Sequence, residues 1–155
     1  MKKITIGRKE VQKQHIIDAR FIQLNQRDCI NQLFLDEEFE GKKEIKRELK
    51  KKLSSYKAQD IKKKRFEDKL FISLFDLIER LVISKLKCIY CKSDVVLIYN
   101  CVRYPKQWTL DRVNNDMGHN TDNVVIACLE CNLKRRRIND KKFLFTKQMK
   151  IIKKY

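Results

Sequence analysis

Apolar residues in the first half of the chain recur at helical spacing. Between residues 11 and 39 they lie three or four positions apart, or twice that, with polar residues between them. This is the pattern of an amphipathic α-helix. The polar run Asn25–Asp28 predicts a break in the helix, and Gly41 is expected to end the segment.

A wider apolar stripe lies between residues 70 and 86. Its members are Phe71, Leu74, Phe75, Ile78, Leu81 and Val82. A stripe of this width is typical of a helix that packs into the core. We therefore predict a core helix with no role beyond packing, which leads the chain directly to Cys88.

Lysine dominates the segment between these two patterns, residues 42–69. Glutamates at helical spacing from lysines favour a solvated helix over a disordered tail, although Ser54 and Ser55 could interrupt it. Two interpretations stay open. The helix is either a solvated face with no dedicated ligand, or a face that lies along a phosphate backbone.

Short β-branched and aromatic runs replace the helical pattern after residue 87. They predict strands near Val95–Tyr99 and Gln107–Asp111, a polar loop from Val113 to Asp122, and a further strand at Asn123–Cys128. One or two helices are expected from Asn132 onward. The predicted fold class is therefore α+β.

The expected organisation has two parts. Residues 1–86 form a basic helical region that grips nucleic acid, and residues 87–155 form a strand–loop–strand–helix module. The formal net charge of +17 over 155 residues attracts polyanions, of which nucleic acid is the commonest. DNA is the expected partner, and RNA, including ribosomal RNA, and an anionic membrane surface are alternatives.

No apolar run is long enough to span a bilayer, and the opening "MKKITIGRKE" lacks the apolar stretch of a signal peptide. We therefore expect an intracellular protein, in the cytoplasm, nucleoid or nucleus, that does not span a membrane. The lysine-rich, glycine-poor composition would suit the AT-rich genome of a virus or mobile element.

Four of the six cysteines form two Cys-x-x-Cys pairs: Cys88, Cys91, Cys128 and Cys131. Two such pairs predict one tetrahedral zinc site, which fits them better than a redox role does. Four thiolates leave no open coordination position, so this zinc is expected to be structural. Cys29 and Cys101 are interpreted as small apolar residues, because disulfides seldom persist inside cells.

Catalysis would need oxygen ligands instead. Asp111 ends a predicted strand, and Asn132 follows the second cysteine pair. A zinc clamp would bring these two residues together, and their oxygens could hold Mg²⁺ or Mn²⁺ on a phosphodiester. The alternative roles are a loop-capping carboxylate for Asp111 and a helix N-cap for Asn132.

These motifs together resemble the HNH (ββα-metal) endonucleases, and most closely the four-cysteine subgroup typified by phage recombination endonucleases that resolve branched DNA. The resemblance covers about residues 88–137. It rests on the cysteine pairs, on "LDR", and on Asn123 and Asn132. It implies that Asp111 and Asn132 bind the catalytic divalent metal and that Asn123 braces the loop.

The sequence departs from the family at the base position. Arg112 stands where the family usually has the histidine that activates water, and arginine cannot accept a proton at physiological pH. Arg112 could clamp the scissile phosphate instead. His119 in the loop is one candidate base and a structural histidine is the alternative. His15 lies in the helical part without an identifiable partner.

The residues after Asn132 are basic. In a ββα-metal fold their helix packs beside the cleaved strand, so Lys134, Arg135, Arg136 and Arg137 are expected near phosphates, with about two of them in contact. Trp108 is expected in the core. Binding is therefore predicted to depend on backbone charge more than on base edges.

Two functions remain open from the sequence. The first is a metal-dependent DNA endonuclease, for which dimerisation through apolar helices would supply the two active sites of a double-strand cut. The second is a non-catalytic, zinc-stabilised nucleic-acid-binding protein on an HNH-derived scaffold. A basic zinc protein on ribosomal RNA explains the charge but not the spacing of Asp111 and Asn132.

Overall fold

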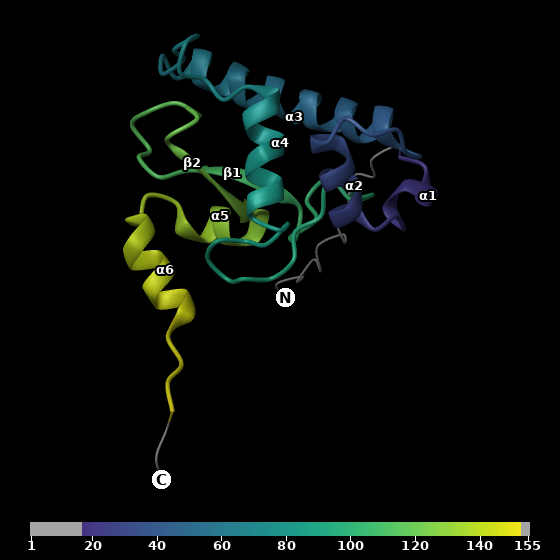
Figure 1. Cartoon of the computed structure of the whole chain (residues 1–155). Helices are drawn as coiled ribbons and strands as arrows, with labels where there is room; N and C mark the ends of the chain where they lie inside the picture. The colour runs from purple at the N-terminus through teal and green to yellow at the C-terminus, as the bar shows by residue number, and fades with distance from the viewer. Residues whose placement is uncertain (1–16, 153–155) are drawn as a thin grey trace, which may run out of the picture.

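Helices and one small antiparallel sheet make up residues 17–152, the part of the chain that the computed structural model describes (Figure 1). This confirms the α+β class. His15 lies outside the described residues. The elements are α1 (Ala19–Ile22), α2 (Gln26–Phe34), α3 (Lys42–Lys62), α4 (Leu74–Ile83), β1 (Trp108–Arg112), β2 (Val124–Cys128), α5 (Leu129–Arg135) and α6 (Asp140–Gln148).

Short polar residues set the boundaries of the N-terminal helices. Asn25 caps α2 by accepting a hydrogen bond from the Asp28 N–H, so the predicted break falls just before that helix. Gly41 begins α3 and does not end the earlier helix. Its φ of 87° lies in the left-handed region, where glycine is favoured. The long helix α3 then continues through Ser54 and Ser55 without interruption.

Helix α4 begins at a capping box in which Ser73 and Asp76 satisfy each other's backbone N–H groups. Leu77, Ile78 and Leu81 are its buried residues. Phe75 was predicted to join them but is 61% exposed, because it points toward Phe34 on the outer side of α2, with ring centroids 5.8 Å apart.

The sheet consists of β1 and β2, paired from Trp108 opposite Cys128 to Arg112 opposite Val124. Both strands were predicted to within one residue. The strand predicted at residues 95–99 is wrong. The Gln26 side chain accepts hydrogen bonds from the Leu97 and Ile98 N–H groups and donates to the Ile98 carbonyl. One side chain of α2 thus takes the backbone hydrogen bonds that a partner strand would have used.

The helical part and the hairpin share one hydrophobic core that includes Leu49 of α3, Leu81 of α4 and Trp108 of β1. Trp108 is a core residue, as predicted. The hydroxyl of Tyr56 on α3 accepts a hydrogen bond from the Leu110 N–H at 3.1 Å. Helix α3 is thereby fixed across the hairpin. Within the described part of the chain, no helix is long and apolar enough to cross a membrane.

Cys128 ends β2 and caps α5, so the strand leads directly into the helix. Arg136 has a φ of 51° and ends α5. Helix α6 then extends away from the rest of the molecule toward the C-terminus (Figure 1). It is attached through Phe143, whose ring contacts Tyr90 edge-on at 4.9 Å between centroids.

Candidate metal centre and nucleic-acid interface

The four predicted cysteine ligands form one cluster. Their Sγ atoms all lie within 4.8 Å of one another, and the Sγ atoms of Cys91 and Cys128 are 3.9 Å apart. Tetrahedral zinc with Zn–S bonds of about 2.3 Å needs sulfurs about 3.8 Å apart. The donor set and its spacing therefore fit one structural zinc ion.

A bound cation would stabilise the buried thiolates of this cluster. Desolvation raises the pKa of Cys131 to about 11, which disfavours its thiolate, whereas the hydrogen bond with Cys128 lowers the pKa of Cys88 to about 4. A bound Zn²⁺ would offset that cost by supplying positive charge among the sulfurs. The remaining described cysteine of the core, Cys29, packs as a small apolar residue, as predicted.

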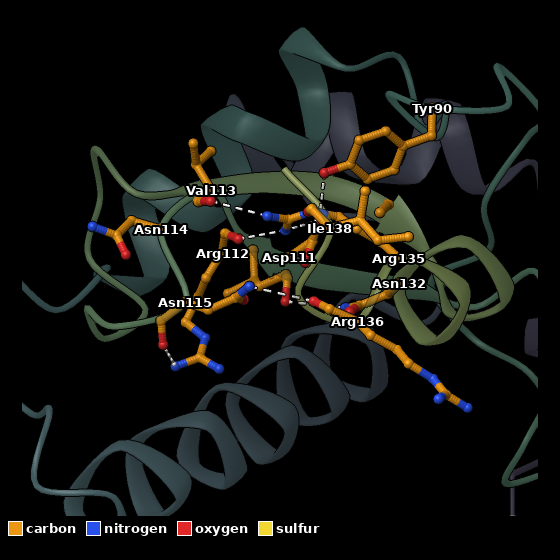
Figure 2. Close-up of polar contacts among 12 residues, drawn as sticks. Tyr90, Asp111, Arg112, Val113, Asn114, Asn115, Asn132, Arg135, Arg136 and Ile138 are labelled. Carbon is orange, nitrogen blue, oxygen red and sulfur yellow. Dashed lines mark hydrogen bonds and ion pairs between the residues drawn. The ribbon is translucent and has the colours of Figure 1, made fainter. Parts of the chain in front are cut away.

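Asp111 lies at the end of β1 and is only 4% exposed. Its Oδ2 accepts hydrogen bonds from Arg135 Nη1 at 2.7 Å and from the Tyr90 hydroxyl at 2.5 Å (Figure 2). Burial raises the pKa of Asp111, while Tyr90 and Arg135 act in the opposite direction. The carboxylate expected to bind a catalytic metal ion is therefore already paired with the Arg135 guanidinium.

Asn132 lies on α5 against the same strand. Its amide nitrogen donates to Thr109 Oγ1 at 3.0 Å and to the Leu110 carbonyl at 3.4 Å. The alternative role as an N-cap does not apply, since Cys128 caps α5. The fold therefore brings Asn132 to the end of β1 that carries Asp111, but the Asp111 carboxylate is directed toward Arg135 and Tyr90.

The expectation that Arg135 reaches phosphates is wrong. Arg135 is 1% exposed, and besides Asp111 its guanidinium contacts the backbone carbonyls of Arg112, Val113 and Ile138. A buried carboxylate needs a buried cation, and the position in the basic run that faces inward supplies it. The other three members of the run, Lys134, Arg136 and Arg137, are exposed.

Asn123 joins the two ends of the loop between the strands. Its Oδ1 accepts from the Asn114 N–H at 2.8 Å, and its Nδ2 donates to the carbonyls of Asn114 and Gly118. These contacts hold the loop closed where the resemblance implies a bracing asparagine.

His119 follows that loop's glycine and is buried against α3. Its Nδ1 lies 2.8 Å from Asp60 Oδ1, and its backbone N–H donates to Asp60 Oδ2. Since a carboxylate only accepts, Nδ1 carries the proton and Nε2 of the neutral ring keeps a lone pair. Burial lowers the pKa of His119, although Asp60 opposes the shift. Burial thus favours the neutral ring.

Sequence reasoning missed Asp60. The signal was its place on the buried stripe of α3, after Ile45, Leu49 and Tyr56. A carboxylate on an apolar stripe needs a partner, but 59 positions separate Asp60 from His119, so the sequence could not name it.

Arg112 points away from Asp111 and donates from its Nη1 to the carbonyl of Asn115 (Figure 2). The same Nη1 donates to the carbonyl of Met117. It lines a cavity of about 280 Å³ between the loop and the end of α3. We call this cavity the basic pocket. Its lining residues are Gln59, Asp60, Lys62, Lys63, Arg65, Arg112 and His119.

Comparison of the chain with protein-family models, curated proteins and solved structures found no match.

Proposed function

We propose that this chain is a DNA endonuclease of the HNH type, stabilised by a structural zinc. The observation that carries the proposal is the order of elements: β1, β2 and α5 follow one another, and the four-cysteine cluster joins the end of β2 and the start of α5 to the segment before β1. This is the ββα arrangement that the resemblance implies.

Arg112 and His119 supply the chemistry available to this site. Arg112 would hold the phosphate and stabilise charge that develops on its oxygens. Neutral His119 would accept a proton from the attacking water at Nε2, while Asp60 keeps the ring in the required tautomer. Water attacks phosphorus, the bond between phosphorus and a sugar oxygen of the DNA breaks, and that oxygen takes up a proton from solvent.

The predicted Mg²⁺ or Mn²⁺ ion does not fit the present arrangement of its two ligands. Arg135 Nη1 lies 2.7 Å from Asp111 Oδ2, where it would compete with a metal for that oxygen. The Asn132 amide nitrogen is bonded to Thr109 and Leu110. No step is therefore assigned to a second metal.

A non-catalytic nucleic-acid-binding protein is the second candidate. The Asp111–Arg135 ion pair favours it, because that pair closes the expected metal seat and links β1 to α5 as a structural contact would. The exposed basic residues after Asn132 would serve this function equally well.

Cleavage assays separate the two candidates. Zinc-loaded protein is incubated with supercoiled plasmid and with branched DNA, with Mg²⁺, with Mn²⁺ and with neither. Chelators are omitted because they would remove the structural zinc. The test variants are Asp111→Asn, Asn132→Ala and His119→Gln, and exposed Lys50→Gln is the control.

The endonuclease predicts cutting by the wild-type chain and by Lys50→Gln, and at least about 100-fold slower cutting by His119→Gln. If cutting depends on added metal in the wild-type chain and is lost in Asp111→Asn and Asn132→Ala, Arg135 must move away from Asp111 when the ion binds. Intact DNA with folded, zinc-loaded protein under every condition would favour the non-catalytic candidate.

A further inference from the structure

The basic pocket joins segments that are far apart in the sequence. Lys62 ends α3, Lys63 and Arg65 follow it, and Arg112 ends β1. Among the described residues that line the pocket, Asp60 is the one carboxylate, and both its oxygens already accept hydrogen bonds from His119. Four cationic side chains thus surround a cavity whose single negative charge is engaged.

We propose that the basic pocket binds a phosphate group of the DNA backbone. The site would use side chains from the helical part and from the hairpin at once, so α3 supplies part of the DNA-contacting site as well as a solvated face. The proposal rests on DNA binding, which both candidate functions share, and not on cleavage.

The orientation of Arg112 suits this ligand. Two carbonyls hold its Nη1, which fixes the plane of the guanidinium before any ligand arrives. Arginine in a fixed plane matches the oxygens of a phosphate better than a flexible lysine does. Arg65 lies close enough to oppose the charge of Arg112, and an anion between them would relieve that repulsion.

The His119 ring can report the binding of a ligand in the basic pocket, because the ring lines the pocket and is held in a fixed position. Asp60 binds its Nδ1, and the Tyr56 ring packs against it at a tilt of 37°, with centroids 4.5 Å apart. Arg112 and Asp111 act on it through charge, the first favouring the neutral ring and the second the protonated one. A bound phosphate adds negative charge, so it should raise the pKa of His119.

Nuclear magnetic resonance of the imidazole ring tests the proposal. The chain contains two histidines, so His15→Gln leaves His119 as the single signal. Zinc-loaded protein is titrated with a short thymidine oligonucleotide, with inorganic phosphate, and with sodium chloride at matched ionic strength. The pKa of His119 is measured with and without each ligand.

The oligonucleotide is expected to shift the His119 resonance saturably and to raise its pKa by about one unit. Arg65→Gln should weaken oligonucleotide binding about ten-fold. Lys50→Gln removes the same charge from an exposed position of α3 outside the pocket, and should weaken binding about two-fold or less.

Three results would overturn the proposal. The first is an unmoved His119 signal when the oligonucleotide is bound. The second is an equal loss of affinity in Arg65→Gln and Lys50→Gln. The third is a His119 shift that inorganic phosphate produces and the oligonucleotide does not. DNA cleavage with an unmoved His119 signal would remove the pocket and keep the endonuclease, with its general base at a residue other than His119. A shifted signal without cleavage would keep the pocket and remove the endonuclease.

Discussion

Buried and half-buried charged residues connect distant segments of this chain. Asp111 meets Arg135, Asp60 meets His119, and Lys52 of α3 reaches Gln107 and the Trp108 carbonyl. Each contact satisfies a charge or dipole that would be costly to bury alone. Residue identity at these positions therefore affects stability as well as chemistry.

Replacing Arg135 tests the first of these contacts. Arg135→Leu leaves the Asp111 carboxylate buried without its cation, so the free energy of unfolding should fall by about 3–5 kcal/mol. Urea unfolding of zinc-loaded protein measures it. Arg137→Leu, at an exposed position of the same basic run, should change stability by about 0.5 kcal/mol or less. Equal stability of the two variants would contradict a structural role for Arg135.

Lys52 predicts a specific pH dependence. Burial lowers the pKa of Lys52 from the ordinary 10.5 to about 7. At pH values between these two pKa values, Lys52 is protonated in the unfolded chain and mostly neutral in the folded one, so the unfolded chain binds more protons. Stability should therefore rise with pH, by about 2 kcal/mol between pH 7 and pH 9. Lys52→Met should flatten the rise, and exposed Lys51→Met should keep it. The same slope in both variants would show that Lys52 is not the group responsible.

At the scale of elements, the hairpin is too small to be stable by itself. A sheet of two strands has few hydrogen bonds. Here the cysteine cluster holds the end of the hairpin at Cys128, and α3 contacts the hairpin at Leu110 and at His119 in the loop. The position of Asp111, Arg112 and Asn132 thus depends on both attachments.

Removing zinc tests the first attachment. We expect about one zinc ion per chain, and a chelator should unfold β1, β2 and α5, with loss of hydrogen-exchange protection there. Cys128→Ala should lack the metal, whereas Cys29→Ala, outside the cluster, should retain it. Full protection of the hairpin without zinc would contradict this role of the cluster.

Gly118 tests the second attachment. A Cβ at this position would lie 2.5 Å from the Arg65 carbonyl oxygen and 2.9 Å from Asp60 Oδ2. Gly118→Ala must therefore push the loop away from α3, at a cost of about 1–3 kcal/mol in the free energy of unfolding. Val113→Ile adds one carbon to an exposed position of the same loop and should cost about 0.5 kcal/mol or less. A Gly118→Ala variant as stable as the wild type would contradict the close approach.

At the scale of the whole molecule, the net charge of +17 predicts that binding to a polyanion depends mainly on charge. Binding to DNA should weaken steeply as salt rises, because each neutralised phosphate releases counterions. Arg136→Gln, at an exposed position after α5, should reduce the slope of log K against log salt by about 1, as measured by fluorescence anisotropy. Buried Arg135 makes no such contribution. An unchanged slope in Arg136→Gln would place the DNA elsewhere.

The sequence by itself determined the local features. Helical spacing predicted α3 and α4, alternation and turn residues predicted β1 and β2, and the spacing of four cysteines predicted their cluster. These features depend on near neighbours or on a chemistry with strict ligand spacing. The failed strand at residues 95–99 depended on one distant side chain, Gln26.

Only the tertiary structure decided which charges meet. It paired Asp111 with Arg135, placed Asp60 beside His119, and gathered Arg112 with the cations at the end of α3. Periodicity shows which residues face inward, but not which element they will face. Burial then selects partners by the free energy of an unpaired charge, which is a property of the whole fold.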